Sequence, residues 1–318
     1  ISSVFETAVT NRLMSDREVG CFLSGGLDSS LVTALACKNL KTQLQTFSIG
    51  LKGSTDLKYA AKVAKYLDTK HHEVYFTEKE GINAIEEVIY SIESYDITTI
   101  RASVGMYLLS KYIKENTNVK VILSGEGSDE LTQGYIYFHN APNEKEAHEE
   151  SVRLLKDLYR YDILRSDKTT SSQGLEVRVP FLDKNFVDFY MSIQGDIKIP
   201  KDKCEKYLLR KAFDNNILPD EILWRAKEAF SDGVSGLETS WYEIIQKHVE
   251  ILISDEDLDN AKEKYKHNTP LTKEAYWYRE IFCKYFGDKN SELIQYMWMP
   301  KWSNSTDPSA RSLQNYIQ

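Results

Sequence analysis

Two hydrophobic periods alternate along the first 142 residues of the chain. Short apolar runs, typical of strands buried in a sheet, occupy residues 18–23, 44–49, 72–76 and 120–123. Between them, apolar residues at helical spacing occupy residues 29–40, 56–67, 79–92 and 102–115. This alternation predicts an α/β fold, with a parallel sheet that carries helices on both faces. The C-terminal ends of its strands should share one edge, where such sheets bind ligands.

The pattern changes after residue 142. Strand-like runs fade, and apolar residues recur at helical spacing over residues 144–161, 184–191, 206–215, 240–253 and 273–286. We therefore predict an α/β core over residues 1–142, extended by a mainly helical C-terminal lobe over residues 143–318. The polar end of the chain is expected to be partly frayed.

The first predicted strand runs into a loop with two glycines and then a helix start rich in small hydroxyls, Ser24-Gly25-Gly26-Leu27-Asp28-Ser29-Ser30. Glycines let the backbone turn tightly beside a charged ligand, and the first turn of a helix directs unpaired N–H groups at it. The pattern predicts a phosphate-binding loop and therefore a nucleotide.

This loop has no Gly-Lys-Ser or Gly-Lys-Thr, the sequence that delivers a lysine to the β- and γ-phosphates. Asp28 stands where that lysine would be. Because a carboxylate repels a polyphosphate, the two need a divalent cation between them. We therefore predict Mg²⁺ at this loop and argue against terminal phosphoryl transfer.

A second loop repeats the design. The strand over 120–123 leads into Ser124-Gly125-Glu126-Gly127-Ser128-Asp129-Glu130. Alone, this segment is equally consistent with an acidic turn. If the two strands are parallel neighbours, Ser24 and Ser124 share one edge, and Asp28 and Asp129 can hold one metal ion against a polyphosphate. The two loops together favour a catalytic site.

Composition narrows the class of partner. The chain has 318 residues and 42% hydrophobic content, enough for a full core. Its formal net charge is -8 and it has no long basic run, which argues against a nucleic-acid partner. We find no apolar stretch long enough to cross a membrane. The four cysteines are widely separated, so we expect reduced thiols in a cytoplasmic protein.

Longer motifs carry a resemblance to a known family. Residues 24–30 resemble the pyrophosphate loop of the ATP pyrophosphatase superfamily, with its adenine nucleotide alpha hydrolase-like fold. The match narrows to the synthetase domain of the glutamine-dependent asparagine synthetases through residues 95–103, 124–142, 174–183 and 224–233. This resemblance covers nearly the whole chain. Residues 132–133 and 298–302 are more similar to the animal-type branch.

The resemblance implies ATP-dependent conversion of aspartate to asparagine. In the family, the side-chain carboxylate of aspartate attacks the α-phosphate of ATP, which gives β-aspartyl-AMP and magnesium pyrophosphate. Ammonia then displaces AMP. The implied cofactors are ATP and Mg²⁺.

The resemblance also assigns roles to residues. It implies that the ATP-binding residues are Leu23, Ser24, Gly25, Gly26, Asp28, Ser29, Ser30, Ile49, Ser124 and Gly125. Among these, Leu23 and Ile49 would line the adenine pocket. Lys227 would stabilise charge on the α-phosphate, and Lys206 would contact phosphate.

Glu126 is implied in formation of the intermediate and in removing a proton from the attacking ammonia. A third metal ligand is the competing role for this residue. Thr99 and Arg101 are the candidates to hold aspartate, because a guanidinium forms a bidentate fork for a carboxylate.

The full family enzyme carries an N-terminal glutaminase domain whose amino-terminal cysteine attacks glutamine. We find no counterpart, since the earliest cysteine, Cys21, lies within a predicted strand. We therefore expect a piece of a longer protein that uses free ammonia, whereas its full-length parent takes nitrogen from glutamine. A homodimer is compatible with the family.

Two other hypotheses stay open. One is another adenylating member of the superfamily, such as a tRNA-thiolating, lysidine-forming or β-lactam-forming enzyme. The acidic net charge and the lack of cysteine pairs argue against the RNA-modifying versions. The other is a non-catalytic binding module that retains the fold, which the set of Asp28, Glu126, Asp129 and Lys227 disfavours.

Overall fold

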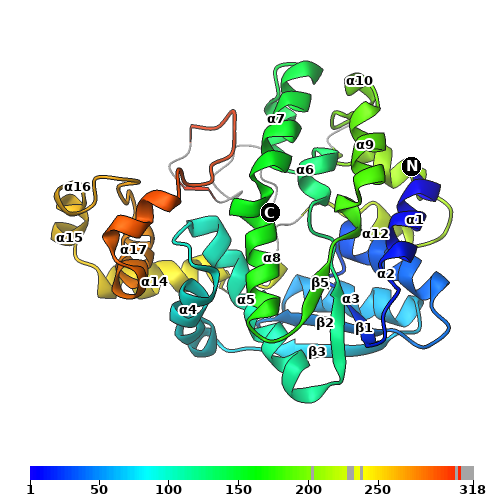
Figure 1. Ribbon diagram of the computed structural model, residues 1–318, viewed down its shortest axis with the longest axis horizontal. Coiled ribbons are helices and arrows are strands. Elements are labelled where there is room, and N and C mark those ends of the chain that lie inside the picture. Colours follow the sequence, from blue (N-terminus) through cyan, green and yellow to red (C-terminus); the bar gives the residue numbers. More distant parts are fainter. Residues whose placement is uncertain (202–203, 228–232, 237–238, 305–306, 309–318) are drawn as a thin grey trace.

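The computed structural model describes residues 1–201, 204–227, 233–236, 239–304 and 307–308 (Figure 1). Its centre is a five-stranded sheet with the strand order β3-β2-β1-β4-β5. The strands are β1 (Glu18–Phe22), β2 (Gln45–Gly50), β3 (Lys70–Tyr75), β4 (Val119–Leu123) and β5 (Glu176–Arg178). Every neighbouring pair is parallel, as the alternation of strands and helices predicted.

The fifth strand was not predicted. The segment Glu176–Arg178 pairs with β4 through Val121, Ile122 and Leu123, so the edge of the sheet comes from the half of the chain that we expected to be helical. A strand of three residues is too short to show a period of two, which is why the pattern did not reveal it. The α/β core thus extends beyond residue 142.

Helices cover both faces of the sheet. Successive side chains of a strand point to opposite faces. On β1, Cys21 accordingly packs with Leu31 of α2 (Leu27–Asn39) in one hydrophobic cluster. Phe22 packs with Ile100 of α5 (Ile97–Asn116) in another. The first face also carries α1 (Ser2–Asn11) and α3 (Thr55–Tyr66), and the second also carries α4 (Glu78–Ile92).

The rest of the chain is mainly helical. Its α-helices are α6 (Ser128–Thr132), α7 (Glu144–Asp157), α8 (Asp162–Ser171), α9 (Lys184–Ser192), α10 (Gly195–Lys198), α11 (Tyr207–Ala212), α12 (Asp220–Leu223), α14 (Trp241–Leu252), α15 (Asp255–Asp259), α16 (Ala261–Lys264) and α17 (Lys273–Phe286). The 3-10 helices are η1 (Ile136–Asn140), η2 (Leu158–Arg160), η3 (Pro180–Leu182) and η4 (Asp288–Leu293). In Figure 1, α14 to α17 gather at the side of the molecule beyond α4.

Capping explains where helices differ from the prediction. Helix α5 begins at Ile97, five positions before the predicted start at 102, because the Asp96 side chain accepts a hydrogen bond from the Thr99 N–H at 2.8 Å. Helix α14 begins close to its predicted start, where Ser240 and Glu243 form a capping box. The predicted helix over 206–215 is shorter, at Tyr207–Ala212.

Within the described ranges, no helix is both long enough and apolar enough to cross a bilayer. The predicted fraying of the C-terminal end falls mostly on residues outside the described ranges.

Candidate active site

The two serine-glycine loops lie side by side. Strands β1 and β4 are parallel neighbours, with Cys21 opposite Leu123, and this is the condition on which a shared edge for Ser24 and Ser124 depended. Strand β2 lies next to β1 on one side, with β3 beyond it. Strand β4 lies on the other side of β1. This reversal of strand order is the place where open α/β sheets bind ligands. A Cβ added at Gly125 would lie 2.9 Å from Ser29 N, so the loops touch.

Steric contacts at a glycine and internal hydrogen bonds fix the conformation of the first loop. Gly25 has φ +74°, and a Cβ there would lie 2.4 Å from the Ala60 backbone nitrogen, so only glycine fits. The hydroxyls of Ser24 and Ser29 lie 3.0 Å apart, and Ser29 Oγ also accepts a hydrogen bond from Ser24 N. The loop ends at the N-terminus of α2, whose free N–H groups favour an anion.

A cavity of about 260 Å³ opens above these loops. Its wall contains every predicted site residue except Gly25, Ser30 and Thr99. Ser30 is fully buried, and Gly25 lies behind the wall against Tyr59 and Ala60. The sequence prediction therefore converges on one cavity.

Two lysines pair with the loop aspartates, and one of them bridges both. Lys206 Nζ lies 2.6 Å from a carboxylate oxygen of Asp28 and 2.7 Å from one of Asp129. Lys227 Nζ lies 2.6 Å from the other oxygen of Asp129. Burial would raise the pKa of Asp129, but the two ammonium groups outweigh it and hold that pKa well below its ordinary value. Asp129 is therefore ionised at neutral pH.

Lys206 is held in an uncommon conformation. Its φ of 57° places it in the left-handed region, and it is only 2% exposed. It stands just before α11, and its side chain reaches across to the loops. Backbone strain of this kind, about 1–3 kcal/mol, persists where the surroundings over-determine it and clusters at functional sites.

The donor set at the loops suits Mg²⁺, although no group of three or more acidic, histidine or cysteine side chains in the described part of the chain is arranged to hold a metal by itself. Asp28 and Asp129 lie on the same cavity, joined through Lys206. Mg²⁺ is usually bound by one or two carboxylates, with phosphate oxygens and water as the other ligands. Two carboxylates beside a phosphate-binding loop meet that requirement.

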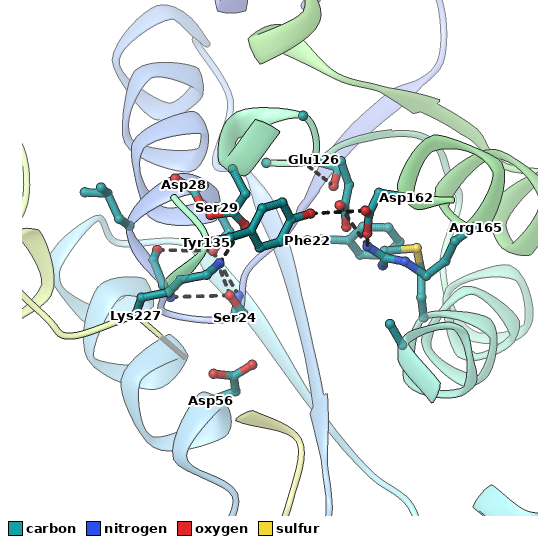
Figure 2. A pocket seen from close by; sticks show the side chains of 18 of the residues that line it. Phe22, Ser24, Asp28, Ser29, Asp56, Glu126, Tyr135, Asp162, Arg165 and Lys227 are labelled. Atoms are coloured by element: carbon teal, nitrogen blue, oxygen red, sulfur yellow. Dashed lines mark hydrogen bonds and ion pairs between the residues drawn. The ribbon is translucent and has the colours of Figure 1, made fainter. Parts of the chain in front are cut away.

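Glu126 contacts Arg165, an arginine that the sequence analysis did not identify as a site residue. Arg165 Nη2 donates to Glu126 at 2.9 Å and to Asp162 at 2.7 Å. Burial raises the pKa of Glu126, the charge of Arg165 opposes that rise, and the charge of Asp162 adds to it. Figure 2 shows Glu126, Asp162 and Arg165 converging on one another. Glu126 is thus ready to take up a proton.

Tyr135 and Glu130 complete this group. The Tyr135 hydroxyl donates to Glu130 at 2.8 Å, and its oxygen also lies 3.2 Å from Asp162. Burial, together with the charges of Asp162 and Asp129, raises the pKa of Glu130 well above its ordinary value. We refer to Glu126, Glu130, Tyr135, Asp162 and Arg165 as the acidic cluster.

The two residues predicted to hold aspartate have other partners. Thr99 Oγ1 donates to Asp96 at 2.8 Å, and Thr99 is not on the cavity wall. Arg101 does lie on the wall. Its Nε and Nη2 bind Glu274 at 2.7 and 2.6 Å, and its Nη1 and Nη2 bind Asp307 at 3.0 and 2.8 Å. Two carboxylates of the chain thus occupy the fork that was assigned to a substrate.

The predicted adenine pocket has an apolar wall. Leu23 and Ile49 line the cavity together with Phe22, Phe47 and Met106. The Leu23 N–H is not available to read a base edge, since it donates to the Phe47 carbonyl at 2.8 Å. The side chains can still pack against a flat aromatic ring.

Arg225 ties the segment that carries Lys227 to the first loop. Its guanidinium donates to the Gly25 carbonyl at 3.2 Å and lies 4.0 Å from the centre of the Tyr59 ring. Asp56 lies 3.6 Å from it. The sequence offered a weak signal for Arg225, which is next but one to Lys227. It offered none for Asp56.

Comparison with known proteins agrees with this geometry. The family model described as asparagine synthase matches residues 1–147 and 139–306. The chain belongs to the asparagine synthase family. It is 57% identical over 319 residues to the asparagine synthetase [glutamine-hydrolyzing] of Cricetulus griseus, 56% identical over 322 residues to that of Gallus gallus, and 55% identical over 319 residues to that of Homo sapiens.

These alignments cover 98% or 99% of the chain but 57% of each relative, so the chain spans little more than half the length of these asparagine synthetases. A solved NMN synthetase from Francisella tularensis also aligns, with 14% identity and a TM-score of 0.34 over 95% of this chain and 99% of that one. That likeness is weak and supports no conclusion. The family membership confirms the resemblance on which the site was predicted.

Proposed function

We propose that this chain is the aspartate-activating and amide-forming part of an ATP-dependent asparagine synthetase. The observation that carries the proposal is the meeting of Asp28, Glu126, Asp129, Lys206 and Lys227 on one cavity of an asparagine synthase fold. The reaction joins aspartate and ammonia, and it converts ATP to AMP and pyrophosphate.

Pyrophosphate binding falls to the first loop and the two lysines. The hydroxyls of Ser24 and Ser29 and the N-terminus of α2 present donors to anionic oxygens. Lys227 stabilises the charge that develops on the α-phosphate when a fifth oxygen approaches it, which is worth several kcal/mol where water is excluded. Burial lowers the pKa of Lys227, but the charges of Asp129 and Asp28 outweigh it and leave that pKa raised, so the ammonium form is present.

Asp28 and Asp129 are the residues that would hold Mg²⁺, which supplies neutralisation of the pyrophosphate charge when bound. Lys206 then pairs with phosphate oxygens instead of both carboxylates. This role is the phosphate contact that the family resemblance assigns to Lys206, and it gives the buried side chain an anionic partner.

The β-carboxylate of aspartate attacks the α-phosphorus, a P–O bond forms, and the bond to the pyrophosphate oxygen breaks. Ammonia then attacks the carbonyl carbon of β-aspartyl-AMP, and the bond to the AMP oxygen breaks. Glu126 accepts the proton that the attacking nitrogen releases, since its carboxylate lies on the cavity wall and burial has raised its pKa. Arg101 contributes to aspartate binding in this scheme only if Asp307 leaves its guanidinium, and Thr99 lies off the cavity wall.

The nitrogen source follows from the relatives. Their printed names describe glutamine hydrolysis, and each is longer than this chain. We propose that a glutaminase domain supplies ammonia in the full-length protein and that this chain alone uses ammonium salts. We further propose a cytoplasmic location, which suits the four cysteines in their free form.

The test is to incubate the chain with Mg-ATP, aspartate and ammonium chloride, and to quantify AMP, pyrophosphate and asparagine. We expect the three products in equal amounts. A parallel reaction without aspartate should release no pyrophosphate. Formation of ADP and phosphate, or pyrophosphate release that does not depend on aspartate, would contradict the proposal.

A further inference from the structure

Arg165 is a buried arginine with unused donors. Its side chain is only 4% exposed, yet it lies on the wall of the cavity. Its Nη2 serves both Glu126 and Asp162. Its Nε and Nη1 are buried and have no hydrogen-bond partner among the residues that the structure describes. A buried donor without a partner costs free energy, so these donors indicate a ligand that bears acceptors.

The surroundings of Arg165 define the charge of that ligand. The acidic cluster contains three carboxylates and one guanidinium, so it is negative unless protons bind. A simple dicarboxylate would add repulsion. A group with a carboxylate for Arg165 and an ammonium for Asp162 would add none, and the α-amino acid head has this composition.

The position of Arg165 decides which carboxylate it can receive. In Figure 2, Lys227 and Asp28 lie on one side of Tyr135, and Arg165 lies on the other side with Glu126 and Asp162. The reacting carboxylate of aspartate has to reach the phosphate beside Lys227. Only the α-carboxylate can therefore lie against Arg165.

We propose that Arg165 binds the α-carboxylate of aspartate through an unpartnered donor of its guanidinium, with Asp162 facing the α-ammonium group. The proposal rests on the proposed function. It assigns to Arg165 the task that the sequence assigned to Arg101, whose guanidinium is already occupied by Glu274 and Asp307.

The experiment measures kcat and the KM values for aspartate and ATP in the wild-type chain and in Arg165→Gln and Arg165→Lys. Because the lost hydrogen bond joins two charged groups, we expect the KM for aspartate in both variants to rise by about tenfold to a hundredfold. The KM for ATP should stay within about threefold of the wild-type value. Arg153→Gln is the matched control, because Arg153 pairs with Glu150 away from the cavity wall, and its KM values should be unchanged.

Two results would overturn the inference while the proposed function stands. One is a fall in kcat with an unchanged KM for aspartate, which would mean that Arg165 only orients Glu126. The other is found in the wild type alone, so it does not depend on folding of a variant. β-Alanine lacks the α-carboxylate of aspartate, so its inhibition constant against aspartate should be at least tenfold higher than the KM for aspartate. Equal values would contradict the inference. No asparagine from the wild-type chain would instead remove the proposed function, and this inference with it.

Discussion

At the scale of single residues, the site depends on charges that are buried together. Asp129 keeps its charge because Lys206 and Lys227 both pair with it. The pKa of Glu126 shifts in the opposite direction to that of Asp129, because burial raises it. One cavity therefore holds an ionised aspartate for phosphate chemistry beside a carboxylate suited to proton transfer.

Replacing Glu126 by glutamine removes this proton acceptor with little change of shape. We expect kcat for asparagine formation to fall by about a hundredfold or more. Glu149→Gln, on the exposed side of α7, serves as the control and should keep wild-type kcat. Wild-type turnover in Glu126→Gln would exclude a catalytic role for Glu126.

Much of the site was predictable because its residues follow one another in the chain. The segments Ser24–Ser30 and Ser124–Glu130 carry their chemistry in consecutive positions, and the period of the strands placed them at one edge. Arg165 was not predictable, since 39 residues separate it from Glu126 and only the packing of α8 brings them together. The partners of Arg101 also come from distant segments, so its occupied fork left no sequence signal.

At the scale of elements, the first loop depends on a glycine that has no room for a side chain. Gly25→Ala would place a methyl group 2.4 Å from Ala60 N, so the loop and α3 would have to separate. We expect the KM for ATP to rise at least tenfold. Gly174→Ala is the control, because Gly174 has a similar φ of +71° but nothing within 4 Å.

The control should cost only about 1 kcal/mol of stability from backbone strain, with an unchanged KM for ATP. Steady-state kinetics and denaturant unfolding of both variants check this pair. Equal KM values for ATP in the two variants would mean that crowding at Gly25 does not shape the loop.

Arg101 joins α5 to α17 through a buried ion pair. Its partner Glu274 is fully buried, so Arg101→Met would leave a buried carboxylate with a hydrogen bond from Gln246 but without its cationic partner. We expect a loss of about 3–5 kcal/mol in the free energy of unfolding. Lys273→Met, which breaks only pairs with the exposed Glu250 and Asp255, should cost under about 1 kcal/mol. Similar losses in urea unfolding of the two variants would contradict a structural role for Arg101.

At the scale of the whole molecule, stability should depend on pH through the histidines of β3. Both ring nitrogens of His71 contact hydroxyls, of Thr46 at 2.9 Å and of Ser48 at 3.1 Å. Burial lowers the pKa of His71, and also that of His72. Below the ordinary histidine pKa near 6.5, the unfolded chain therefore binds protons that the folded chain does not.

The contribution of these two histidines to stability is thus expected to decrease as the pH falls from about 7 towards 5. His71→Gln should show a smaller decrease than the wild type over the same range, because the substituted side chain does not titrate. Urea unfolding at both pH values provides the comparison. Equal decreases in the two proteins would show that His71 makes no contribution.

The central claim is that the carboxylate of aspartate attacks the α-phosphorus of ATP in the cavity between the two loops. Aspartate labelled with ¹⁸O in its β-carboxylate tests this claim most directly. In the proposed reaction one labelled oxygen stays on phosphorus when ammonia displaces AMP. Mass spectrometry should therefore find a single ¹⁸O in AMP and none in pyrophosphate. Unlabelled AMP, or label in pyrophosphate or phosphate, would contradict the account.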